Sequence, residues 1–96
     1  GVMIDERDWA ALMIPHDLRE RVSHITVAAL REFGVEVETW EDSGYWLFDC
    51  HPHPGSETVV RALNIARQAV GAPLFESVDE YLTYRSWAFS NPEKVA

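Results

Sequence analysis

The chain is short of cysteine and of long hydrophobic segments. Its 96 residues include one cysteine, Cys50, so no disulfide can form within the chain. The longest stretch without Asp, Glu, Lys or Arg covers residues 22–30, far below the roughly 18 residues that span a bilayer. A lone thiol suits a reducing compartment, and the first residues lack a basic head followed by an apolar stretch. We therefore expect a cytoplasmic protein without a membrane span or an export signal.

Lysine and arginine are absent from residues 32–60, which contain seven Asp and Glu residues. The whole chain has 16 acidic and 8 basic residues and a formal net charge of -8, so this segment carries most of the excess. A field of one sign repels phosphate backbones and anionic lipid and attracts basic surfaces. We expect a basic protein surface as the partner, and no direct binding of nucleic acid or membranes. In charge character alone, the chain resembles small acidic immunity proteins, antitoxins and virus-encoded inhibitors that block a basic site.

The length and the hydrophobic content of 47% fit a single compact domain over residues 1–96, since separate domains usually need roughly 100 residues each. We expect residues 1–4 and 91–96 to be frayed. Four amphipathic segments predict helices. They begin near Asp5, near His16 or Asp17, at Ser56 and at Ser77, and the second helix ends at Gly34.

Alternating apolar and polar residues predict a β-hairpin between the second and third helices. Residues 35–41 alternate Val-Glu-Val-Glu-Thr-Trp-Glu, residues 42–44 have turn chemistry, and residues 45–48 are aromatic and apolar. Residues 74–76 are either a short third strand or an apolar connection. The predicted fold is therefore α+β, with about four helices on one face of the hairpin, in the order α-α-β-β-α-(β)-α.

The period of two divides the hairpin into two faces. Both turn registers compatible with the sequence assign the same residues to each face. The core face holds Val35, Val37, Thr39, Trp46, Phe48 and Cys50. The outer face holds Glu36, Glu38, Trp40, Tyr45, Leu47 and Asp49. Carboxylates among large aromatic side chains suit a binding surface for a basic protein, whereas the alternative is a solvated face that only keeps the chain soluble.

The segment around Cys50 offers a second type of chemistry. His51 and His53, separated by one proline, could hold zinc or another divalent ion, but no second pair of ligands at zinc spacing accompanies them. The alternation points Cys50 inward and its surroundings are acidic, which disfavours a reactive thiolate. The main hypothesis is thus a small non-enzymatic protein with an inhibitory, immunity-type or regulatory role and no cofactor. The alternative is a zinc-binding or metal-dependent domain centred on His51 and His53.

The sequence leaves two alternatives for the role of Trp87 and two for self-assembly. Trp87 lies off the apolar stripe of the fourth helix, so it either closes the core or serves as a second contact anchor. A homo-oligomer through the outer face is disfavoured because like charges would meet, but helices could still mediate assembly.

Overall fold

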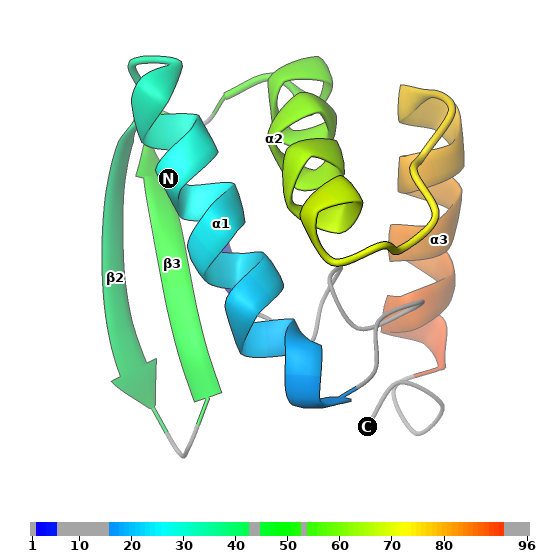
Figure 1. The fold of residues 1–96 in the computed structure, drawn as a ribbon, viewed down its shortest axis with the longest axis horizontal. Helices are drawn as coiled ribbons and strands as arrows, with labels where there is room; N and C mark the ends of the chain where they lie inside the picture. Colours follow the sequence, from blue (N-terminus) through cyan, green and yellow to red (C-terminus); the bar gives the residue numbers. More distant parts are fainter. Residues whose placement is uncertain (1, 6–15, 43–44, 53, 92–96) are drawn as a thin grey trace.

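A computed structural model describes residues 2–5, 16–42, 45–52 and 54–91 of the chain (Figure 1). The elements are listed here in chain order: β1 (Val2–Asp5), the 3₁₀ turn η1 (His16–Leu18), α1 (Arg19–Glu32), β2 (Glu36–Asp42), β3 (Tyr45–His51), α2 (Ser56–Ala69) and α3 (Val78–Ser90). The fold is a small α+β domain, as the sequence predicts. The helix predicted to begin near Asp5 falls on residues 6–15, which lie outside the described residues, whereas Asp5 itself is the last residue of β1.

The sheet has three antiparallel-paired strands in the order β1-β3-β2. The hairpin of β2 and β3 is confirmed, and the pairing of Asp42 with Tyr45 leaves Ser43-Gly44 as the connection. The third strand is β1 and not residues 74–76, which form a connection without strand pairing. β1 and β2 run parallel on either side of β3, the arrangement of a split β-α-β unit.

The helices lie on one side of the sheet, with α1 nearest to it and α2 and α3 farther out (Figure 1). Fully buried apolar residues of the core come from the sheet and from two helices: Phe48 and Cys50 of β3, Val22 and Leu30 of α1, and Leu63 of α2. The apolar stripes predicted for α1 and α2 point to this core, since their members are buried or half-buried against it. Thr39, predicted on the core face, is exposed, because β2 is an edge strand that the helices cover only in part.

The sequence predicts that glycines end α1, at Gly34, and α2, at Gly71, and both helices stop there. Gly34 and Gly71 have φ values of 87° and 76°, a conformation that residues with a Cβ adopt only under strain. The backbone N–H of Val35 donates to the Leu30 carbonyl at 3.1 Å, and that of Ala72 donates to the Arg67 carbonyl at 2.8 Å. These are the long hydrogen bonds of Schellman motifs. The first motif turns the chain directly from α1 into β2.

The connection from α2 to α3 is fastened by side chains of α2. The Asn64 amide donates to the Phe75 carbonyl and accepts from the Phe75 N–H, both at 2.9 Å. Asn64 is half-buried, and its side chain satisfies both backbone groups of Phe75. Phe75 in turn packs edge-on against Tyr81 at 5.6 Å between ring centroids, which places α3.

Arg67 is the unexpected member of the core. It is fully buried, its Nε donates to the Pro73 carbonyl at 2.7 Å, and its guanidinium lies 4.1 Å from the centroid of the Phe75 ring. Burial lowers the pKa of Arg67, an effect that the nearby Glu80 and Tyr84 oppose.

The apolar spacing of α3 predicts four inward residues: Val78, Tyr81, Leu82 and Phe89. Tyr81 is buried and Val78 is half-buried, whereas Leu82 is exposed, so the prediction is wrong for Leu82. The Phe89 side chain lies outside the described part of the structure.

Candidate functional site

The pairing register of β2 and β3 determines which residues share the outer face of the sheet. Glu36 lies opposite His51, Glu38 opposite Asp49, and Trp40 opposite Leu47. Residues directly opposite each other in an antiparallel pair project to the same side, and so do residues two apart on one strand. Val37 and Cys50, which form an intervening pair, are both buried under the helices. The residues of the first three pairs therefore belong to the opposite, outer face.

The acidic side chains of this face differ in exposure. The Glu38 side chain is 78% exposed, whereas that of Asp49 is 19% exposed. Glu36 is exposed as well, and Trp40 is 37% exposed. The side chains of Tyr45 and Leu47 lie outside the described part of the structure, so their place in a binding surface stays a prediction. Glu36, Glu38 and Trp40, all on the edge strand β2, are thus the accessible part of the predicted site.

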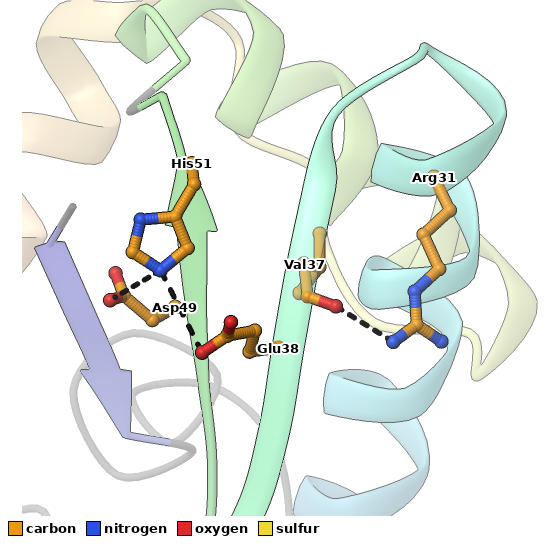
Figure 2. A network of polar contacts seen from close by, with 5 residues as sticks. All are labelled: Arg31, Val37, Glu38, Asp49 and His51. Atoms are coloured by element: carbon orange, nitrogen blue, oxygen red, sulfur yellow. Dashed lines mark hydrogen bonds and ion pairs between the residues drawn. The ribbon is translucent and has the colours of Figure 1, made fainter.

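His51 joins the two strands of the outer face (Figure 2). Its Nε2 lies 3.1 Å from Asp49 Oδ2 and 3.9 Å from Glu38 Oε2. From the sequence, His51 is predicted to lie in a loop and to bind metal together with His53. The contacts of His51 with Asp49 and Glu38 were not predicted. The signal was present, because β3 continues to His51 and the period of two places it on the face of Asp49.

The two carboxylate oxygens of Asp49 differ in their contacts. Oδ2 faces the His51 ring, whereas Oδ1 is buried and has no hydrogen-bond partner among the described residues. A buried carboxylate oxygen without a donor costs free energy. The Asp49 carboxylate contacts His51 and raises the pKa of the Cys50 thiol, and it is largely hidden from solvent. The exposed carboxylates of the outer face are those of Glu36 and Glu38.

Arg31 of α1 contacts β2 along the edge that does not pair with β3. Its Nη2 donates to the Val37 carbonyl at 2.9 Å, and this carbonyl points away from β3 toward α1 (Figure 2). An edge strand exposes unpaired backbone groups that can recruit another chain, and a charged side chain on the edge blocks such pairing. Arg31 thus closes part of the β2 edge and leaves the outer face of the strand as its accessible surface.

Cys50 lies on the buried side of β3, one residue before the strand ends at His51. It is fully buried opposite Val37, as the alternation predicts. Burial, and to a smaller extent the adjacent Asp49 charge, raises the pKa of the Cys50 thiol. A buried thiol that holds its proton is a poor nucleophile, so the geometry gives Cys50 a packing role.

The predicted metal site is only partly covered by the structure. His53 lies outside the described residues, so its distance from His51 stays open. Within residues 16–42, 45–52 and 54–91, no group of three or more His, Cys, Asp and Glu side chains is arranged to hold a metal ion. Zinc at His51 and His53 therefore remains a prediction.

A separate set of large apolar side chains is exposed on the helical side. Trp87 of α3 is 42% exposed, and Ile65, Leu74 and Leu82 are exposed to a similar degree. The first interpretation of Trp87, closure of the core, accounts for only part of its surface. Its role as a second contact anchor stays a prediction.

Comparisons with protein families, with curated proteins and with solved structures give no match to this chain. None of the helices in the described part of the chain has the length and apolar character needed to cross a membrane. The chemistry of the outer face is therefore the basis for a functional assignment.

Proposed function

We propose that this protein binds a basic surface of another protein through the outer face of β2 and β3, in an inhibitory, immunity-type or regulatory role and without catalysis. The observation that supports the proposal is the register, which gathers Glu36, Glu38, Trp40 and Asp49 on the side of the sheet opposite the helices. Seven acidic residues without a lysine or arginine across residues 32–60 add a field of one sign to this face.

The acidic residues and the aromatic residue have separate parts in the proposed binding. Exposed Glu36 and Glu38 steer a basic partner toward the face and raise the association rate, an effect that salt screens. Trp40 offers a large rigid surface, and tryptophan is enriched among the residues that carry most of the binding energy. The like charges of Glu38 and Asp49 on directly opposite positions destabilise the sheet. A basic partner would relieve that repulsion.

The proposal is tested by affinity capture from native lysate at low and moderate salt, with mass-spectrometric identification. The bait is compared with the double variant Glu36→Lys/Glu38→Lys and with Glu76→Lys/Asp79→Lys, which makes the same charge change at exposed positions on the α3 side. A basic protein retained by the wild type and by the second variant, but lost by the first, is the expected result. Equal retention by all three baits contradicts the proposal.

A further inference from the structure

Much of the free edge of β2 is exposed. Among the described residues, β3 is the only strand that pairs with β2, which lies at the outer margin of the sheet (Figure 1). Residues 38–41 are all exposed, so the described helices cover little of this part of the strand on either face. An edge of this kind presents a row of backbone N–H and C=O groups with which a further strand can pair.

The Val37 carbonyl shows which backbone groups point to this edge. It points away from β3 and accepts the hydrogen bond of Arg31 Nη2 at 2.9 Å (Figure 2). In an antiparallel pair, residues that bond to the partner strand alternate with residues whose N–H and C=O both point away from it. Thr39 and Glu41 alternate in step with Val37, so their backbone groups point to the edge as well. Arg31 therefore closes the edge at Val37, and the groups of Thr39 and Glu41 remain for another strand.

The charge of β2 selects what can pair with this edge. Four of its seven residues are acidic, and none is lysine or arginine. A second copy of the edge, paired antiparallel with the first, would bring acidic residues of the two copies together, and like charges on neighbouring strands destabilise a sheet. A strand with lysine or arginine at alternate positions would instead place its cations beside the exposed Glu36 and Glu38. Charge complementarity thus favours a basic strand over self-association.

We propose that the partner contributes an extended basic segment, which pairs antiparallel with the free edge of β2 and adds a strand to the described three-stranded sheet. The inference rests on the proposed function and names the form in which the basic surface is presented. The backbone groups of Thr39 and Glu41 exchange hydrogen bonds with the segment and supply affinity. Its cationic side chains lie beside Glu36 and Glu38 on the outer face, and an apolar side chain between them lies beside Trp40, which supplies selectivity. Antiparallel pairing is the more stable of the two strand directions.

The experiment measures the affinity of the fluorescently labelled peptide Lys-Thr-Ile-Thr-Lys-Thr-Lys, which has the seven-residue length of β2. Paired antiparallel over this length, the peptide places its lysines and its isoleucine on the outer face and turns the N–H groups of its threonines toward β2. N-methylation of the second and fourth residues removes the N–H groups that would donate to the Glu41 and Thr39 carbonyls. N-methylation of the third and fifth residues is the matched control, because it adds the same number of methyl groups on the side that faces solvent.

We expect the unmethylated peptide to bind in low salt. Methylation toward β2 should weaken binding by about tenfold or more, and methylation toward solvent by less than about threefold, because only the first removes hydrogen bonds to the edge. Equal losses with the two methylated peptides overturn the edge pairing and leave the proposed function intact. Absence of binding by the unmethylated peptide, or binding that Glu36→Lys/Glu38→Lys does not weaken, overturns the proposed function and the edge pairing together.

A second measurement observes the edge in the wild-type protein. Amide hydrogen exchange is followed by NMR with and without saturating peptide. The inference requires the Thr39 and Glu41 amides to exchange at least about tenfold more slowly in the complex, whereas the Glu38 and Trp40 amides, which face β3, change less. Unchanged exchange at Thr39 and Glu41 contradicts the pairing. Protection of these two amides in the free protein that grows with protein concentration would assign the edge to a second copy of the chain and overturn the proposal.

Discussion

Asp49 and His51 lie two residues apart on β3, and their side chains meet on the outer face with Nε2 and Oδ2 separated by 3.1 Å. The residue between them, Cys50, is fully buried on the other side of the sheet. One strand therefore connects the proposed binding face with the core. Asp49 influences both sides, because it contacts His51 and also raises the pKa of the Cys50 thiol.

The Cys50 thiol should react slowly with an alkylating agent. Because its pKa is raised, the reactive thiolate forms only above the pH at which an ordinary thiol ionises, about 8.5. Asp49→Asn removes the smaller of the two causes and should move the pH profile of alkylation part of the way down, while burial keeps it above that of a free thiol. Mass spectrometry after timed reaction with iodoacetamide provides the measurement. Alkylation of the native wild type as fast as that of a short cysteine peptide would show that Cys50 is accessible.

Trp40 should be the main anchor of the outer face. If Trp40 is central to the interface, Trp40→Ala should weaken binding of the captured partner by about 2 kcal/mol or more, measured by isothermal titration calorimetry. Trp87→Ala is the control, because Trp87 is exposed to a similar degree but lies on α3. A loss of less than a few tenths of a kcal/mol for Trp40→Ala would make it an ordinary surface residue, and a large loss for Trp87→Ala would place the contact on α3.

Arg67 should stabilise the fold mainly through packing. Its Nη1 and Nη2 have no hydrogen-bond partner among the described residues, so burial of the charge is costly. Arg67→Met keeps a long side chain against Phe75 without the charge, and Arg67→Ala leaves a cavity. We expect Arg67→Ala to lower the free energy of unfolding by about 2 to 4 kcal/mol and Arg67→Met by less than about 1.5 kcal/mol. Urea denaturation gives both values, and equal losses would assign the stability to the polar contact with Pro73.

The zinc alternative is decided by a metal assay on chelator-free protein. A tight site at His51 and His53 predicts bound zinc and a higher melting temperature on adding zinc, since a ligand that binds the folded state stabilises it. His51→Ala and His53→Ala should then each abolish the shift. Less than about a tenth of an equivalent of metal, together with no thermal stabilisation, would remove the alternative.

Periodicity alone predicts the hairpin, the two faces of β3 and the inward sides of α1 and α2. The reason is that the spacing of apolar residues is a local property of each element. Gly34 and Gly71 likewise mark the helix ends, since their backbone conformation excludes most other residues. The outer position of Glu38 and the inward position of Cys50 follow from the alternation of side chains along each strand.

The rest depends on contacts between distant segments. β1 is short, and its partner β3 lies more than forty positions along the chain, so nothing local marks Val2–Asp5 as a strand. Arg67 is buried because a loop carrying Pro73 and Phe75 folds over it, which no helical periodicity reveals. The contact between His51 and Glu38 depends on the strand register. The sequence is compatible with two turn positions, and each turn position gives a different register.

The most direct test of the central claim compares the salt dependence of oligolysine binding by the wild type, Glu36→Lys/Glu38→Lys and Glu76→Lys/Asp79→Lys. Both double variants raise the net charge from -8 by the same amount, so only the location of the change differs. We expect the first variant to bind weakly with a flattened salt dependence, and the second to retain most of the affinity and the steep dependence of the wild type. Equal losses in the two variants would show that net charge, and not the outer face of β2 and β3, determines binding.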